Sequence, residues 1–332
     1  APGAKDATIT SNSGLTNTCG FTVTRDVTAP ASVSITYATQ YLTSVSTKAA
    51  LTVSDGTETG GAGIDTATRK LQRASSPLSG GLCTSYGAFA DTTYAGTYPN
   101  ITDAGTMTDA TCYKYQWIIS DYVGNTTTYA GTNDVKYDTT QPTAPTASVS
   151  ESSANIYFAS GAKTLYYKTP GSSQTFDVSA TPTDPQSAIA SVTFPGINTT
   201  GFTPTTDTVD TTSTYVNTYT IAISAVASPG AKTLTATNGA SLQNTDTLTV
   251  TVDVTAPTGS SVTCTSPYDT DGSYNVTGTA GSDAGATVDT TASYFQRRTG
   301  TLSGNTCASW LSYSNQGAAN AVNLGETSLA TG

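Results

Sequence analysis

The sequence predicts an all-β protein of tandem β-sandwich domains joined by short proline-containing linkers. Short segments alternate apolar residues with Thr or Ser, which is typical of strands with one buried and one solvated face, and no segment has a helical period. Three similar strings, at 26–30, 138–142 and 253–257, also recur. Their prolines are 112 and 115 residues apart, about the length of one small sandwich.

The three strings predict the domain boundaries. Each begins with Asp and ends with Pro. Proline lacks the amide hydrogen that a β-ladder needs and restrains the preceding residue to extended geometry, so each string should end one domain and lead into the next. The predicted parts are an incomplete domain reduced to a terminal strand or hairpin (1–26), two immunoglobulin-like domains (27–138 and 139–253), and an incomplete third domain (254–332).

The two central domains should each contain about seven short strands, the number expected of an immunoglobulin-like sandwich. The clearest strand patterns lie at 32–37, 48–53, 113–119, 175–180, 190–194, 215–223 and 245–252. The first domain contains cysteine and the second contains none, so they represent two sandwich types.

The third domain repeats the first. The segment 286–307 aligns with 63–83, which places Gln296-Arg297 on Gln72-Arg73 and Cys307 on Cys83. The third domain ends before any counterpart of the hairpin that residues 112–138 supply in the first domain. It is therefore predicted to be of the first type and to lack its final hairpin.

The N-terminal segment reads as the end of a sandwich. Residues 15–30 align without a gap to 242–257, and Leu15, Phe21 and Val23 are expected to join it to a partner. A half-sandwich exposes an apolar face and an unpaired edge, so a partner is required. Two explanations stay open: a longer tandem array, or strand exchange between copies that gives a head-to-tail homopolymer.

These linkers, together with Asp121-Tyr122-Val123-Gly124-Asn125 after the strand at 113–119, resemble the bacterial Ig-like repeat domains of large secreted surface proteins, adhesins and extracellular fibres. In that family a D-x-T-x-P linker and a D-x-x-G-N hairpin turn recur between domains. The resemblance covers essentially the whole chain as a pattern of linkers and strands. It implies stalks, fibres and adhesive arrays outside the cell, usually without catalysis. The cysteine-containing domain departs from the usual cysteine-free repeat.

Five cysteines suggest an oxidising compartment. Cys83 and Cys112, 29 residues apart in one domain, are predicted to form a disulfide worth about 3 to 4 kcal/mol. The remaining Cys19, Cys264 and Cys307 leave two pairings open. Cys307 could pair with Cys264 of its own domain or with Cys19 of a neighbouring copy.

Calcium is the one cofactor that the sequence suggests. Asp269 and Asp271 place carboxylates on alternate residues of a turn, and Asp253 lies near them in the sequence. No EF-hand loop is completed there. Asp and Gly are also ordinary turn residues, and Asp121 to Asn125 is interpreted in that way.

Composition argues against several functions. The chain has no histidine and only three glutamates, in Gly/Ser/Thr-rich loops, so we expect no enzyme. A net charge of −10 with no basic run disfavours nucleic acid, and no apolar run reaches the length of a membrane span. Four N-x-S/T sequons permit glycosylation, at Asn100, Asn125, Asn198 and Asn275.

The sequence therefore predicts a non-enzymatic, extracellular or cell-surface structural protein. Its sandwiches would continue end to end into a filament or surface stalk, with other copies or flanking domains as partners. The alternative is an adhesin segment that binds glycans or host surfaces through exposed loops and Tyr. Trp117 is expected in a core, whereas an adhesive surface would need several exposed aromatic rings together.

Overall fold

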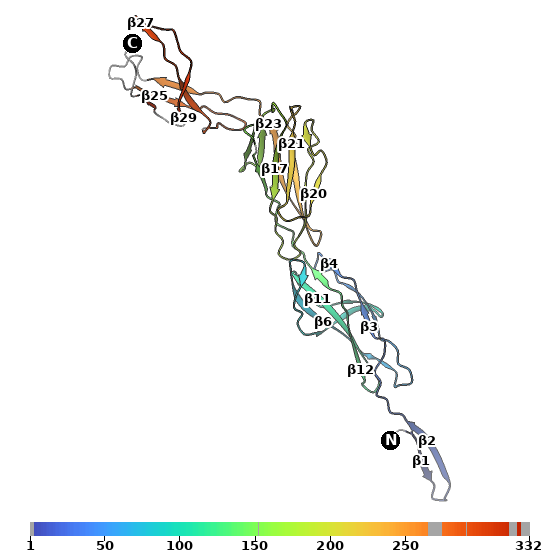
Figure 1. Ribbon diagram of the computed structural model, residues 1–332. Coiled ribbons are helices and arrows are strands. Elements are labelled where there is room, and N and C mark those ends of the chain that lie inside the picture. The colour runs from blue at the N-terminus through green and yellow to red at the C-terminus, as the bar shows by residue number, and fades with distance from the viewer. Residues whose placement is uncertain (1–2, 152, 265–273, 290, 319–323, 327–332) are drawn as a thin grey trace. The chain divides into compact units, whose positions relative to one another are not determined.

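The computed structural model describes residues 3–151, 153–264, 274–289, 291–318 and 324–326 (Figure 1). All regular elements in these ranges are β-strands, which confirms the all-β prediction. No helix in them could cross a membrane. The chain forms two compact units, residues 1–145 with 182–192 and 235–244, and residues 146–181 with 193–234 and 245–332.

The first sandwich, which follows the linker at 26–30, consists of two sheets. One sheet has the order β3-β5-β10-β9 and the other β4-β13-β11-β6-β7, with β12 on β11 and β8 on β6. The strands are β3 (Ser34–Thr36), β4 (Gln40–Leu42), β5 (Ala50–Ser54), β6 (Ile64–Ser79), β7 (Leu82–Cys83), β8 (Ala90–Thr92), β9 (Tyr94–Thr97), β10 (Asn100–Asp103), β11 (Thr111–Asp121), β12 (Thr126–Ala130) and β13 (Val135–Tyr137).

Strand alternation builds the core between these two sheets. In β11 every second residue from Tyr113 to Ile119 is buried, and these side chains pack with Leu51 and Val53 of the opposite sheet. Trp117 is fully buried, as expected, and its indole N–H donates to Asp55 Oδ1 at 3.0 Å. Asp55 also accepts a hydrogen bond from Arg69 Nε at 2.8 Å, so the buried carboxylate is both paired and hydrogen-bonded.

The second sandwich, which follows the linker at 138–142, has the sheet orders β14-β17-β21-β19 and β15-β16-β23-β22-β18-β20. Phe176 of one sheet stacks on Tyr219 beside it, and Tyr167 of the other sheet meets Phe202 edge-on at 5.3 Å. The strands are β14 (Ala147–Ser150), β15 (Ile156–Ala159), β16 (Thr164–Tyr167), β17 (Gln174–Ala180), β18 (Ile189–Phe194), β19 (Phe202–Thr203), β20 (Thr208–Asp210), β21 (Val216–Ile221), β22 (Gly230–Asn238) and β23 (Gln243–Val252).

The C-terminal segment, from residue 254 onward, contains smaller sheets. They are β24 (Ser261–Cys264) with β25 (Tyr274–Thr279) and β30 (Leu324–Glu326), β26 (Tyr294–Arg297) with β29 (Ser314–Ala318), and β27 (Thr301–Ser303) with β28 (Thr306–Ala308). The pairing of Gln296 with Asn315 repeats that of Gln72 with Asp91 in the first sandwich. Among the described residues β26 has no strand in the position that β11 takes beside β6.

The N-terminal hairpin consists of β1 (Gly3–Thr10) and β2 (Thr16–Val23), which pair only with each other among the described strands (Figure 1). All side chains along both strands are exposed. The sequence predicted a terminal strand or hairpin here, and a hairpin is present.

The predicted disulfide between Cys83 and Cys112 is confirmed. It joins β7 to β11, on either side of β6, whose residues Leu78 and Ser76 pair with Cys83 and Cys112. It therefore ties the closing part of the first sandwich to the strands before it.

We expect the double substitution Cys83→Ala, Cys112→Ala to lower the free energy of unfolding of the first sandwich by about 3 to 4 kcal/mol, because a closed loop in the unfolded chain is lost. Urea denaturation measures this loss. The matched control, Cys19→Ala with Cys307→Ala, alters two exposed free thiols and should leave stability unchanged. A loss below about 1 kcal/mol in the first variant would contradict the expectation.

Candidate metal centre

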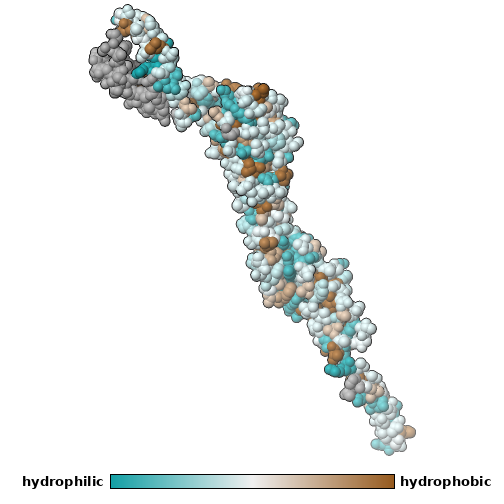
Figure 2. Space-filling model, viewed as in Figure 1, coloured by the Kyte–Doolittle hydropathy of each residue, from teal (hydrophilic) through white to brown (hydrophobic). Residues whose placement is uncertain are grey.

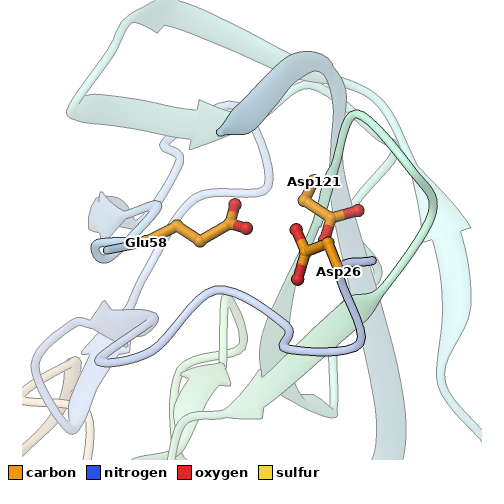
Figure 3. A group of neighbouring side chains, drawn as sticks. All are labelled: Asp26, Glu58 and Asp121. Carbon is orange, nitrogen blue, oxygen red and sulfur yellow. The ribbon is translucent and has the colours of Figure 1, made fainter. Parts of the chain in front are cut away.

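Three carboxylates converge at the linker that enters the first sandwich (Figure 3). Asp26 begins the linker, Glu58 lies in the loop between β5 and β6, and Asp121 is the last residue of β11. One carboxylate oxygen from each lies within 4.8 Å of the others. In Figure 3 the Glu58 side chain extends toward Asp26 and Asp121.

Asp26 and Asp121 are held by backbone amides. Asp26 Oδ1 accepts from the amide and hydroxyl of Thr28, and Oδ2 accepts from the amide of Ala62. These bonds, that of the Thr28 amide foremost, lower the pKa of Asp26 to about 2. Burial opposes ionisation of Asp121, but hydrogen bonds from Asn125 and the turn amides keep its pKa below the usual value.

Glu58 has the opposite environment. Both of its carboxylate oxygens are buried, and neither has a hydrogen-bond partner of normal geometry. Desolvation, followed by the close approach of the Asp26 carboxyl group and by the charges of Asp26 and Asp121, raises the pKa of Glu58. Gly61 leaves room for it, because a Cβ there would lie 1.9 Å from Glu58 Oε1 and 2.7 Å from Asp26 Oδ2, and the Glu58 side chain would have to move.

These observations fit a hard divalent cation. Calcium and magnesium take carboxylate oxygens as ligands, and a cation would offset the repulsion among three acids. The oxygens of Glu58 are the orphaned ligands, whereas Asp26 and Asp121 keep lone pairs beyond those that the backbone amides use. We expect a bound cation to join the linker, the loop before β6 and the end of β11, because each of them supplies one carboxylate.

The second linker has an equivalent cluster in which an amide replaces one acid. Asp138, Asp184 and Asn238 are buried, all within the first compact unit. Asn238 Nδ2 lies 3.1 Å from Asp138 Oδ2, 2.9 Å from Asp184 Oδ2 and 3.1 Å from the carbonyl of Thr140. The amide hydrogens thus occupy the place between the carboxylates that a cation would take.

Backbone hydrogen bonds establish this equivalence. Thr143 donates to the carbonyl of Thr183 in the second sandwich as Ala31 does to that of Thr57 in the first, so Asp184 corresponds to Glu58. Asn238 and Asp121 each begin a closing turn in which their own amide donates to the carbonyl four residues on, Leu242 or Asn125. Each side chain also accepts from the amide of that fourth residue.

The third linker repeats the first in part. Asp253 accepts from Thr255 and from the amide of Ala286, as Asp26 accepts from Thr28 and Ala62. The hydrogen bond from the Ala286 amide makes the largest contribution to keeping the pKa of Asp253 below its usual value. Of the residues predicted to bind calcium, Asp253 is described, whereas Asp269 and Asp271 lie outside the described residues. The calcium site predicted there stays a prediction, and the acid cluster that the structure shows is at the first linker.

The remaining predicted residues are placed as follows. Cys19 and Cys307 are free and exposed, and the structure joins neither to another cysteine; the side chain of Cys264 is outside the description. Asn100 and Asn198 are exposed, whereas the Asn125 amide donates to Asp121 within its turn. Asn275 lies in β25. Glycosylation at these four residues stays a prediction.

The sequence alone did not predict that Asp26 and Glu58 belong to an acid cluster. The signal for Asp26 was present, because the linker Asp26–Pro30 repeats Asp253–Pro257, where a calcium ligand was predicted. Asp121 was interpreted as a turn residue, and it does cap its turn. Glu58 has no local signal, because it is one acid in a Gly/Thr loop.

No protein-family model matches the chain, and no curated protein matches its sequence. Among solved structures, the chicken CNTN1 FN1–FN3 domains align over 91% of this chain and 88% of theirs, at 11% identity and a TM-score of 0.27. Activated alpha-2-macroglobulin of Escherichia coli aligns over 84% of this chain and 27% of its own, at 11% identity and a TM-score of 0.24. The human Desmocollin-1 ectodomain aligns over 80% of this chain and 49% of its own, at 11% identity and a TM-score of 0.19. None of them identifies bacterial Ig-like repeats, so that resemblance stays a prediction.

We expect calcium to stabilise the first sandwich, by about 2.7 kcal/mol at a free concentration 100-fold above its Kd. Trp310→Phe leaves the buried Trp117 as the only indole, so its fluorescence reports this sandwich during thermal unfolding. Glu58→Gln should remove the response because it removes the orphaned carboxylate. Equal melting temperatures of the parent chain in calcium and in chelator would contradict a cation site.

The first and second linkers should exchange their response to calcium when the residue that begins the closing turn, Asp121 or Asn238, is exchanged. Asn238→Asp should lower the stability of the second sandwich in chelator by about 1 to 3 kcal/mol, because the bridging amide becomes a third buried acid, and calcium should restore it. Asp121→Asn should make the first sandwich insensitive to calcium. Calorimetry of the full chain follows both transitions. A variant Asn238→Asp that is equally stable with and without calcium would argue against the equivalence.

Proposed function

We propose that this chain is a non-enzymatic structural segment of an extracellular filament or surface stalk, in which β-sandwiches of two alternating types continue end to end. Continuation is supplied by a longer tandem array or by strand complementation between copies. The predicted boundaries at 26/27, 138/139 and 253/254 are part of this proposal. A disulfide between Cys83 and Cys112 supports an oxidising location outside the cell.

The observation that carries the proposal is the repetition of one linker construction. At each of the three linkers the aspartate caps the amide two residues on, in Thr28, Thr140 or Thr255. The residue after each linker proline then donates to the following sandwich, as Ala31 does to Thr57, Thr143 to Thr183 and Thr258 to Ser282. A linker that enters each sandwich in the same way allows domains to be added indefinitely.

The surface supports a structural role as well. On the face shown in Figure 2, apolar residues form separate small patches on a largely neutral or hydrophilic surface. Only 11% of the residues are charged and about one in five is Thr, so hydroxyl groups cover much of the exterior. A hydrated surface of this kind suits a protein that must remain folded outside the cell.

The adhesin alternative would depend on exposed aromatic rings. Trp310 and Tyr313 are 46% and 57% exposed, and both rings lie near the guanidinium of Arg298. When Cys307 is aligned with Cys83, Trp310 occupies the sequence position that corresponds to Tyr86 in the first sandwich. In the first sandwich Tyr86 contacts Lys114 and Asp134 from the closing strands, so an aromatic ring at this position has a packing role there and does not require a glycan.

Immunogold electron microscopy of the producing cells tests this function. An antibody against the first sandwich should label extended structures outside the cell envelope at regular intervals, because the sandwich types alternate along the array. Label inside the cells, or over the surface with no extended structure, would contradict it. A glycan array probed with the full chain tests the alternative, and selective binding there would favour the adhesin.

A further inference from the structure

The N-terminal hairpin has one apolar face that nothing in the described structure covers. Directly opposed residues in an antiparallel pair share a face, and the register pairs Ala7 with Cys19 and Lys5 with Phe21. This face also carries Ile9 and Val23. Ile9, Phe21 and Val23 are 76%, 55% and 45% exposed. The opposite face is polar, with Thr8 bonded to Thr18.

The hairpin is a copy of β22–β23, the hairpin that closes the cysteine-free second sandwich. Residues 1–30 align without a gap to 228–257, and 17 of the 30 are identical. Over residues 1–23 the identity is 11 of 23. Matching the turn of the hairpin to that of β11–β12 in the first sandwich gives only 5 of 23.

The turn of the hairpin is also built like that of β22–β23. Ser11 donates its amide to the carbonyl of Leu15, and its hydroxyl oxygen accepts from the amide of Leu15. Asn238 makes the same two bonds with Leu242. Ser11 therefore stands where Asn238 stands, and the two hairpins present corresponding residues.

The apolar face matches the core positions of the second sandwich. Ala7 and Ile9 correspond to Leu234 and Ala236, which are 1% and 0% exposed. This exchange of a large and a small residue between adjacent inward positions conserves the total volume. Phe21 and Val23 correspond to Leu248 and Val250, whose side chains are 3% and 0% exposed.

The C-terminal segment fits the hairpin less well. That segment is of the first type, in which the closing strand β11 fills the core with Tyr115 and Trp117. The turn alignment places Lys5 and Ala7 of the hairpin at those two positions. In addition Cys112, the partner of Cys83, lies on the first strand of its closing hairpin, whereas Cys19 lies on the second strand of this one.

We propose that the apolar face of the N-terminal hairpin closes a cysteine-free sandwich, taking the place of β22–β23 against strands of the type found at 146–227, and does not close the C-terminal segment of a second copy. This inference rests on the proposed function, since it names the partner that one end of the described structure engages. Among the differences between the two hairpins, Cys19 replaces Asp246, which forms an ion pair with Lys163 at 2.5 Å.

A fusion tests the proposal directly. Residues 140–227 are placed before Ala1 of the full chain, which recreates the cysteine-free strand order with the N-terminal hairpin as its last two strands. We expect hydrogen exchange of the amides in 3–23 to slow by on the order of 100-fold or more relative to the parent chain. Unchanged exchange in the hairpin, with the added strands unprotected, would overturn the proposal.

Variants of the fusion locate the contact. Phe21→Asp should abolish the new protection because it puts a charge in the core, whereas Thr22→Asp, on the opposite face, should not. Cys19→Asp should increase protection because it restores the partner of the lysine at position 163 of the added strands. Equal effects of Phe21→Asp and Thr22→Asp would contradict the assigned face.

Two further experiments test the proposal if the fusion does not fold. Replacing 228–257 by the sequence of 1–30, with Asn238 and Asp246 retained, should leave the melting temperature of the second sandwich within about 5 °C, whereas unfolding of that sandwich would overturn the proposal even if the fusion fails to fold. In the parent chain alone, hairpin protection that rises with concentration together with a higher mass would assign the hairpin to a second copy and also overturn it. Neither experiment depends on where the protein is located, so the filament function can fail independently.

Discussion

The aspartate that begins each linker is the residue on which the rest of the repeat depends. Asp26 fixes its own linker through Thr28 and reaches the following sandwich through the amide of Ala62. Asp253 does the same with Thr255 and Ala286. At the first two linkers, an acid and the closing-turn residue of the following sandwich then meet the linker aspartate. Because the same residue ends one sandwich and positions the next, the linker and the closing hairpin are one construction.

The closing-turn residue decides the chemistry at each linker. Asp121 adds a third carboxylate and creates a cluster that calls for a cation or a proton, whereas Asn238 satisfies two carboxylates with amide hydrogens. Ser11 stands at the same corner of the N-terminal hairpin and would bring neither charge nor amide. Domains of one fold can therefore differ in cation dependence through a single residue, with the backbone hydrogen bonds unchanged.

Much of the fold could be predicted because strands and linkers follow from local sequence patterns, namely apolar–polar alternation and the recurring Asp-to-Pro strings. Each strand predicted between 32 and 252 coincides with an observed one, and two cysteines 29 residues apart within one sandwich form the expected disulfide. The acid cluster could not be predicted in this way. Glu58 and Asp121 are brought together by pairing of β6 with β11, and no local pattern shows that Gly61 leaves room for a carboxylate. The similarity of 1–30 to 228–257 is strongest from residue 15 onward and is interrupted at the turn, where residues 11–14 all differ from 238–241.

The assignment of the N-terminal hairpin as the last two strands of a cysteine-free sandwich can be tested in a cryo-electron microscopy map of the native assembly, at a resolution that separates strands and large side chains. We expect Phe21 and Ile9 to lie in a core without a disulfide, beside strands of the cysteine-free type. A map in which they lie against the strands around Cys307, or in solvent, would contradict it.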